Sequence, residues 1–342
     1  MKPRCRGDSS IGMTILYPLA AVVLLVMLPL IGVQVLGGTY VFGIIVPYVA
    51  LALFVIGFIF RVLKWGSSPV PFHIPTVCGQ QKSFPWIKAS WIDSPNTTRG
   101  VMARLALDIL LFRSLFWNER VEIKKSAQLL YKRNLYLWLG GLAFHWCLFT
   151  ILFRHLRLFT VPIPSLVLLA QTLDGILQSL IPVLYMTDFF ILAALIYLLL
   201  RRLRDSQLRY ISLPSDYFAL LLLLGVICSG TLMRLVYRVD LVKVKGLMVK
   251  LFAFQRASPE NVGVIFYIHL FLVSVLIAYF PFSKLMHTAG VLLSPTRNLK
   301  NNSREHRHIN PWNYPVKVHS YEEYEDEFRQ SMKEAGITVE RE

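Results

Sequence analysis

Six apolar segments, each long enough to cross a membrane, constrain the fold of this chain more than any other feature. A helix that spans a bilayer needs about twenty mostly apolar residues. Six ranges meet that length: 11–30, 40–60, 134–153, 182–200, 215–235 and 262–282. Charged residues make up 16% of the chain, against about a quarter in soluble domains. The sequence therefore predicts an all-α membrane protein with six transmembrane helices.

The basic residues predict how the chain crosses the membrane. In membrane proteins, Lys and Arg collect in the cytoplasmic connections. If the N-terminus is cytoplasmic, most of the 36 basic residues fall in the inside segments 1–10, 61–133, 201–214 and 283–342. We expect an uncleaved first span, both termini in the cytoplasm, and a location in the cell inner membrane. Basic residues beside apolar runs favour membrane lipid, and not nucleic acid, as the partner of this net charge of +16.

Composition divides the chain into four parts. We expect two N-terminal spans, a cytoplasmic loop, a four-helix core and a cytoplasmic tail, over residues 1–60, 61–133, 134–287 and 288–342.

Three connecting stretches carry further signals. From Thr98 onward, arginines recur among apolar residues at helical intervals, which predicts an amphipathic helix. That helix either lies on the inner membrane surface or packs on the bundle. Residues 164–180 are less apolar than the spans, and we expect an amphipathic or re-entrant piece there. The acidic run YEEYEDEF in the tail fits either a solvated end or a contact with a soluble partner.

Four histidines lie within or at the ends of two apolar segments. His145 lies within the third span and His155 at its outer end, while His269 lies near the outer end of the sixth span and His287 just past its inner end. Because these two spans run in opposite directions, His145 matches His287 in depth, and His155 matches His269. An electron-transfer haem takes two axial ligands, so two imidazoles at each of two depths are what two haems need. The pattern predicts a helical bundle with two stacked haem b groups.

The residues alone leave other functions open. An intramembrane histidine can be a structural residue held by a hydrogen bond, or part of a proton relay in a proton-coupled transporter. A third possibility is a non-redox membrane anchor that holds a soluble complex through the loop and the tail. The other four histidines lie in the loop and the tail, and we expect them to be solvated: His73, His306, His308 and His319.

The cysteines do not predict an iron–sulfur cluster in this chain. Such a cluster normally takes four clustered cysteines, whereas this chain has four scattered ones and no C-x-x-C pair. Cys78 stands apart because it lies in the loop sequence PTVCGQQK. It is the candidate for contact with a cluster held by a partner.

The histidine spacings resemble those of the respiratory nitrate reductase gamma-subunit family of dihaem cytochromes b. In that family, one span carries histidines ten residues apart and a later span carries histidines eighteen apart. Both intervals recur here, in His145/His155 and His269/His287. Residues 78–116, CGQQKSFPWIKASWIDSPNTTRGVMARLALDILLFRSLF, resemble the corresponding segment of the DsrM family. DsrM proteins are the cytochrome b subunits of DsrMKJOP complexes and are similar to the membrane subunits of heterodisulfide reductases.

This resemblance implies an electron-transfer subunit. Family members exchange electrons with menaquinone, and a DsrK-like iron–sulfur subunit docks on their cytoplasmic face beside the other DsrMKJOP subunits. The electrons serve dissimilatory sulfite metabolism. By this resemblance, His145 and His287 are expected to bind the iron of an inner haem b, and His155 and His269 that of an outer haem b near a quinone site.

The quinone site is where this chain departs from the family pattern. Nitrate reductase relatives use a lysine near the outer haem, but this chain has no lysine between Lys132 and Lys243. The nearest polar residues are Arg157, Gln171 and Asp174, and we expect the quinone contacts among them. Asp174 is either a proton acceptor for quinol or an exposed loop acid.

Overall fold

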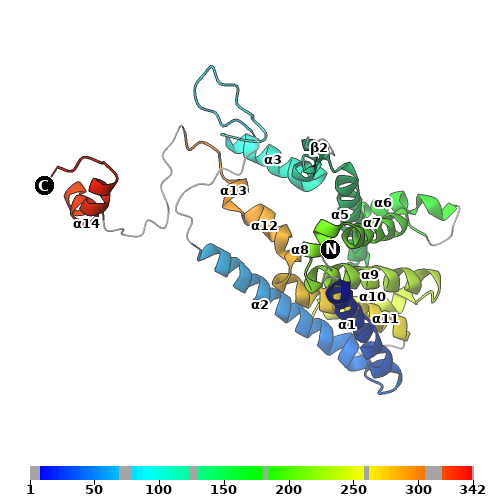
Figure 1. The fold of residues 1–342 in the computed structure, drawn as a ribbon. Coiled ribbons are helices and arrows are strands. Elements are labelled where there is room, and N and C mark those ends of the chain that lie inside the picture. The colour runs from blue at the N-terminus through cyan, green and yellow to red at the C-terminus, as the bar shows by residue number, and fades with distance from the viewer. Residues whose placement is uncertain are drawn as a thin grey trace, which may run out of the picture.

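The computed structural model describes residues 8–68, 79–123, 129–179, 184–257, 262–304 and 318–340 (Figure 1). Four residues named in the sequence analysis lie outside these ranges, and the structure does not bear on them: His73, Cys78, His306 and His308.

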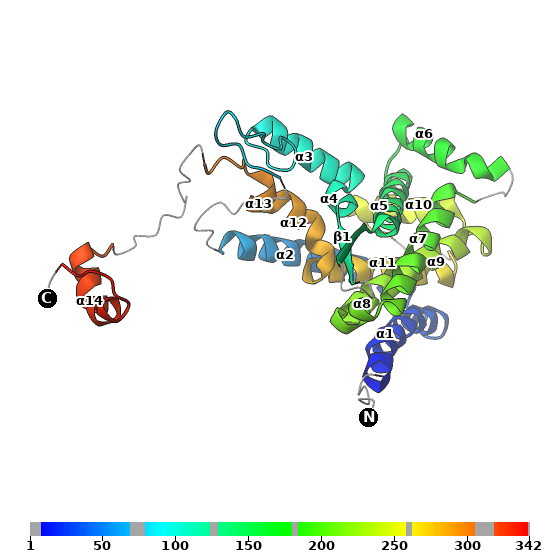
Figure 2. The ribbon, with the colours of Figure 1, turned by 45° about the horizontal axis from the view of Figure 1, so that its top comes forward.

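Helices make up most of this part of the chain (Figures 1 and 2). They are α1 (Asp8–Gln34), the π-helix η1 (Val41–Ile45), α2 (Val46–Gly66), α3 (Thr98–Leu111), α4 (Arg113–Phe116), α5 (Leu135–His155), η2 (Leu156–Leu158), α6 (Ser165–Asp174), η3 (Gly175–Ser179), α7 (Met186–Arg204), α8 (Ser206–Ile211), α9 (Pro214–Leu235), α10 (Leu241–Phe252), α11 (Val264–Tyr279), η4 (Phe280–Phe282), η5 (Lys284–Met286), α12 (His287–Leu293), α13 (Pro295–Asn298) and α14 (Tyr321–Glu334). A short antiparallel hairpin, β1 (Glu119–Ile123) with β2 (Leu129–Arg133), precedes α5.

Five helical stretches of the described chain are long and apolar enough to cross a membrane. They are Met13–Gln34, Val41–Gly66, Leu135–Leu158, Pro214–Leu235 and Val264–Phe282. Each coincides with one of the apolar segments singled out in the sequence. The expectation of an all-α, multi-pass membrane protein is therefore confirmed.

The remaining predicted span, over 182–200, corresponds to α7, which differs from the other five in charge. Asp188 lies in its first turn, and three arginines end it: Arg201, Arg202 and Arg204. An acidic start and a basic end both complement the helix dipole. Between these charged ends, Ile191 and Leu195 are buried in contact with α5 and α9. Helix α7 is thus an integral part of the bundle, and its charged ends account for its lower apolar content.

Helix α9 lies at the centre of the bundle because it contributes to two apolar cores. Leu222 and Val226 pack with α1 and α11. The neighbouring Leu223 and Ile227 pack with α5 and α7. Residues four positions apart lie on the same face of a helix, and the next residue along the chain lies on an adjacent face. One helix therefore joins the α1–α2–α11 side of the bundle to the α5–α7 side.

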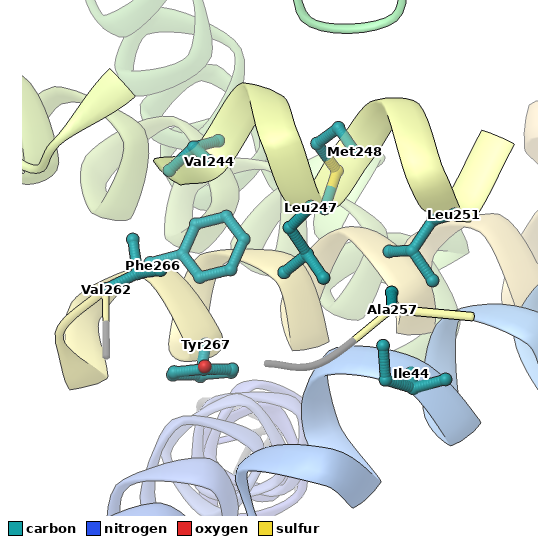
Figure 3. Close-up of a cluster of buried hydrophobic side chains, with 9 residues drawn as sticks. All are labelled: Ile44, Val244, Leu247, Met248, Leu251, Ala257, Val262, Phe266 and Tyr267. Atoms are coloured by element: carbon teal, nitrogen blue, oxygen red, sulfur yellow. The ribbon is translucent and has the colours of Figure 1, made fainter. Parts of the chain in front are cut away.

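A third core attaches α10 to the end of α11 (Figure 3). Val244, Leu247, Met248 and Leu251 follow the helical repeat and are buried against Phe266 and Tyr267 of α11 and Ile44 of η1. This spacing is typical of a helix with one apolar face. Helix α10 connects α9 to α11 and contacts η2, which directly follows α5. It therefore covers the end of the bundle at which α5 ends.

The amphipathic helix predicted in the cytoplasmic loop is α3. Its start agrees with the turn expected from the sequence, since the Thr97 hydroxyl accepts a hydrogen bond of 3.2 Å from the Gly100 amide. Helix α3 packs against α13 (Figures 1 and 2), so one of its faces is covered by the chain itself. The less apolar stretch 164–180 forms α6 and η3, as an additional short helical piece between α5 and α7.

Close packing of α2 on the end of α11 can be tested at Gly57. A Cβ atom there would lie 3.0 Å from Pro281 Cβ and 2.7 Å from Phe282 Cζ. Overpacking of this kind typically lowers stability by about 1–3 kcal/mol, so Gly57→Ala should destabilise the protein by that amount. Gly66→Ala on the same helix is the matched control, since a Cβ atom there would meet nothing within 4 Å. Thermal unfolding in detergent measures both, and equal transitions would contradict the packing described here.

Candidate functional site

The four histidines of the two spans come from three helices. His145 lies in the middle of α5 and His155 is its last residue. His269 lies in the first half of α11. His287 begins α12, after the chain has left α11 through the short helices η4 and η5 around Pro281. The two pairs predicted from depth are therefore carried by elements that face each other across the bundle.

His145 and His287 lie side by side. Their ring centroids are 6.0 Å apart and the rings are perpendicular. Two imidazoles that bind one metal from opposite sides, each through a bond of about 2 Å, have ring centres about 6 Å apart. The inner pair thus has the separation that a shared axial-ligand position requires. Phe112 and Phe144 pack on the His145 ring, with centroids at 4.6 and 5.0 Å.

His155 and His269 form the second pair. Their side chains are close enough to interact electrostatically. The His269 side chain is half-buried, whereas that of His155 is exposed at the end of α5. Gly230 of α9 lets the His269 ring approach closely, because a Cβ atom there would lie 3.1 Å from Cε1 of that ring.

The same nitrogen of every ring is occupied by a hydrogen bond. Nδ1 of His145 and of His155 each lies 2.7 Å from the carbonyl oxygen four residues earlier on α5. Nδ1 of His287 lies 2.9 Å from the Lys284 carbonyl oxygen. A carbonyl oxygen can only accept, so Nδ1 must carry the proton and Nε2 keeps its lone pair. This is the form in which imidazole binds a metal.

His269 reaches the same state through a serine. Its Nδ1 lies 2.9 Å from the Ser229 hydroxyl oxygen. That hydroxyl donates its own hydrogen to the Val226 carbonyl oxygen, at 3.0 Å. The hydroxyl oxygen is therefore free to accept from Nδ1–H, and Nε2 of His269 is again the free nitrogen.

The histidine-bearing helices α5 and α11 pack on different neighbouring helices. Helix α5 packs closely on α7, whereas α11 packs on α1, α2 and α9; α5 and α11 are not a closely packed pair. Among the described residues, no group of three or more His, Cys, Asp or Glu could hold a metal ion by itself. A haem iron needs only two protein ligands, since the porphyrin supplies the others. Two imidazoles in each pair match the two protein ligands that an electron-transfer haem takes.

A buried ion pair, which the sequence did not predict, lies beside the outer histidines. Arg154 Nε is 3.0 Å from Asp174 Oδ2, and both side chains are buried. Asp174 also accepts hydrogen bonds from the backbone amide and the hydroxyl of Thr187, at 2.9 and 2.7 Å. Both carboxylate oxygens are thus occupied. The expectation of an exposed loop acid is therefore wrong, and Asp174 is a residue that ties α5, α6 and α7 together.

A second charged pair extends this cluster to α9. Arg234 Nη2 lies 3.0 Å from Asp188 Oδ1. The guanidinium carbons of Arg154 and Arg234 lie 3.8 and 4.5 Å from the ring centroid of Tyr185, which packs with both. A signal for the cluster was present in the sequence, because Arg154 and Asp188 are charges inside apolar segments, where unpaired charge is disfavoured.

Two of the three residues considered for quinone binding are in contact. Arg157 Nη1 donates to Gln171 Oε1 at 2.8 Å. The pair joins η2, directly after His155, to α6, and both side chains are half-buried. Asp174 faces Arg154 instead and is not part of this pair.

Known proteins of similar sequence cover the part of the chain that carries the four histidines. The profile of the nitrate reductase gamma subunit matches residues 101–303, which include all four. The chain belongs to the nitrate reductase gamma-subunit family. It is similar to the Hdr-like menaquinol oxidoreductase cytochrome b-like subunit of Archaeoglobus fulgidus, with 46% identity over 80% of this chain and 83% of the relative. The protein of the same description from Archaeoglobus profundus is 42% identical, over 78% of this chain and 81% of the relative. The family resemblance inferred from the histidine spacing is thus confirmed.

The buried ion pair gives a stability prediction. Asp174→Ala would leave Arg154 buried without its counter-charge, which typically costs about 3–5 kcal/mol. Removing both charges in the double variant Asp174→Ala/Arg154→Met should recover most of that loss, because no buried charge is then left unpaired. Denaturation of the purified protein in detergent measures the three free energies of unfolding. Additive losses in the double variant would show that the two side chains do not interact.

Proposed function

We propose that this protein is the dihaem cytochrome b subunit of a quinol-linked oxidoreductase complex. The observation that carries the proposal is the common hydrogen-bonded state of His145, His155, His269 and His287, in which Nδ1 is occupied and Nε2 is free. The rings form two pairs, with one member of each pair on α5 and the other on α11 or α12. A haem with two imidazole ligands carries single electrons and leaves no open position for oxygen chemistry.

The residues of the chain would hold and tune each haem in distinct ways. A donated Nδ1–H bond fixes the ring orientation and raises the basicity of Nε2 as a ligand. Carbonyl groups of Gly141, Ile151 and Lys284 serve three of the rings, and the Ser229 hydroxyl serves His269. Aromatic side chains, those of Phe112 and Phe144, pack on the half-buried His145 ring of the inner pair, while His287 is exposed.

The two haems would have different neighbours. His145 and His287 bind the inner haem, at the end of the bundle covered by the loop helices α3 and α4, because Phe112 between those helices packs on His145. His155 and His269 bind the outer haem, near η2, α6 and α10. Most basic residues belong to the segments at the inner end, which supports cytoplasmic termini and an inner-membrane location.

The relatives support the kind of partner. They are described as subunits of an Hdr-like menaquinol oxidoreductase, and residues 78–116 resemble the DsrM family. We therefore propose that this chain acts as a DsrM-type subunit. It would pass electrons between menaquinone and a DsrK-like iron–sulfur subunit on the cytoplasmic face, within a DsrMKJOP complex of dissimilatory sulfite metabolism.

Menaquinol would bind at the outer end. Arg157, two residues after His155, and Gln171 of α6 form a half-buried polar pair. A quinol hydroxyl could hydrogen-bond to this pair close to the outer haem. Asp174 would support this site through Arg154 and would not take up the proton, since both of its oxygens already accept hydrogen bonds or face a cation.

An optical spectrum tests the proposed function. The dithionite-reduced minus oxidised spectrum of the purified protein should show a b-type alpha band, and His269→Ala should remove about half of the haem because one of two iron sites loses a ligand. His319→Ala is the matched control: His319 lies on the exposed tail beside Glu323, so this variant should keep all the haem. A folded, colourless wild-type protein would refute the proposal and leave a transporter or an anchor. Unchanged haem in His269→Ala would refute the ligand assignment.

The quinol site has its own test. Gln171→Ala should slow haem reduction by a soluble menaquinol analogue roughly tenfold, as expected for the loss of a hydrogen bond of about 1.4 kcal/mol. Reduction by dithionite should stay unchanged. Gln178→Ala, in the following helix η3, controls for general effects on this segment. Equal rates in the two variants would exclude Gln171 from the site.

A further inference from the structure

We propose that residues 97–116, which comprise α3 and α4 and are called the brace below, set the relative position of His145 and His287. The brace bonds to α5, which carries His145, and to α13, which follows the helix that carries His287. The proposal rests on the proposed function in one respect, namely that these two histidines share the inner haem. It assigns positioning roles to Arg104, Trp138 and Trp146, which lie outside the histidine pairs.

One end of the brace is bonded to the helix of His145. The last carbonyl groups of a helix have no partner within that helix. At the end of α3, the Leu110 and Leu111 carbonyl oxygens accept hydrogen bonds from the indole N–H groups of Trp146 and Trp138 of α5, at 2.9 and 2.8 Å. The end of α3 is therefore completed by the helix that carries His145.

The junction between α3 and α4, called the corner of the brace below, also contacts His145 itself. Phe112 ends α3 in the left-handed region, with φ of 50°, and its ring centroid lies 4.6 Å from that of His145. A non-glycine residue in this region is strained and is kept there by its surroundings. Asp108 supports the corner by accepting hydrogen bonds from the Ser114 amide and hydroxyl, at 3.0 and 2.7 Å.

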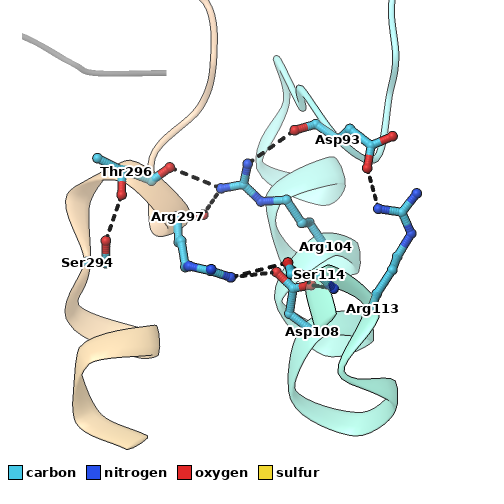
Figure 4. Close-up of polar contacts among 8 residues, drawn as sticks. All are labelled: Asp93, Arg104, Asp108, Arg113, Ser114, Ser294, Thr296 and Arg297. Carbon is cyan, nitrogen blue, oxygen red and sulfur yellow. Dashed lines mark hydrogen bonds and ion pairs between the residues drawn. The ribbon is translucent and has the colours of Figure 1, made fainter. Parts of the chain in front are cut away.

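The other face of the brace is bonded to the segment that follows His287 (Figure 4). The buried Arg104 donates to the carbonyl oxygens of Thr296, at 3.2 Å, and of Arg297. Arg297 Nη1 in turn lies 2.9 Å from Asp108 Oδ2. Both acceptor residues are in α13, which is separated by the extended Ser294 alone from α12, the helix that begins at His287.

The turn that precedes the brace is also held in place by side-chain contacts. Arg113 forms an ion pair with Asp93, and this hydrogen bond lowers the pKa of the Asp93 carboxyl, so that residue is ionised at neutral pH. Asn301 bonds to the same turn through Ser94 Oγ, at 3.0 Å, and the Pro95 carbonyl oxygen, at 2.7 Å. The segment after His287 is thus held to the brace along its length.

These contacts connect His145 and His287, the two proposed ligands of the inner haem, through the residues of the brace. Arg104 and the Leu110 carbonyl are less than two helical turns apart on α3, so α5 and α13 are joined through one rigid element. His287 itself lies after a break in the α11 helix, so the geometry of that helix does not fix its position. The outer histidines, by contrast, have no contact with residues 97–116 among the hydrogen bonds and ring contacts of the described chain.

Arg104→Met tests the link, with Arg99→Met as the matched control. Arg99 is an exposed arginine on the same helix, so both variants lose one positive charge from α3. In a redox titration of the full chain, Arg104→Met should shift or abolish the transition of one haem only. The affected haem should be the one lost in His287→Ala. The Arg99→Met titration should match that of wild type. Equal effects on both haems, or none on either, would overturn the proposal.

Trp146→Phe tests the second attachment. It keeps the aromatic ring but removes the indole donor, so it should affect the same haem as Arg104→Met. Trp86→Phe, in the exposed part of the loop, should have no effect. If Trp146→Phe leaves that haem unchanged, or affects the other one, the brace does not act on α5.

Hydrogen exchange supplies a readout that needs no haem. Loss of the Arg104 bonds should speed amide exchange over α12 and α13 by roughly tenfold or more, while exchange in α9 stays at the wild-type rate. Should the wild-type protein prove to lack haem, the proposed function fails, but this measurement still decides whether the brace holds the His287 segment. Unchanged exchange in α12 and α13 would refute it.

Discussion

The whole arrangement depends on how an imidazole is accommodated between membrane helices. A ring N–H in the bilayer core finds no water, so it needs a protein acceptor. All four rings, including His287 beyond the end of the last span, bond through Nδ1, and three of them use a carbonyl oxygen from their own preceding turn. That choice commits one nitrogen and leaves Nε2 pointing away from the local backbone. A requirement for hydrogen bonding thus also prepares each ring as a ligand.

The charged cluster at the outer end follows from the same constraint. Arg154 and Arg234 lie in the last turns of α5 and α9, and a charge buried between helices is strongly disfavoured unless a counter-charge pairs with it. Arg154 and Arg234 each face an aspartate and share the Tyr185 ring between them. The cluster therefore joins α5, α6, α7 and α9 around His155 with balanced charge. Positive charge is present near the outer pair without an unpaired ion.

Local patterns in the sequence were enough to predict some features, while features that depend on distant partners were not predictable in this way. Apolar length identified the spans, the spacing of the four histidines predicted two pairs, and Thr97 marked the start of α3 as a typical helix cap. Asp174, in contrast, was considered for proton transfer or as an exposed acid. Its role is decided by Thr187, thirteen residues later, and by Arg154 on another helix. Likewise, Arg104 was predicted as part of a basic amphipathic helix, and its acceptors in α13 are almost two hundred residues away. A charged residue in a helical repeat predicts a polar face, but not which chain segment covers it.

The two histidine pairs are held by different kinds of structure, and this difference has consequences for how each can respond. His155 and His269 lie on regular helices of the bundle, and their environment is the packed core around α9. His287 lies after the break at η4 and η5, and its position depends on side chains of the loop. A displacement of the loop would therefore move one member of the inner pair relative to His145 and leave the outer pair in place. The inner pair is the one whose geometry would respond to the loop, because Arg104 and Asp108 of that loop contact the segment after His287.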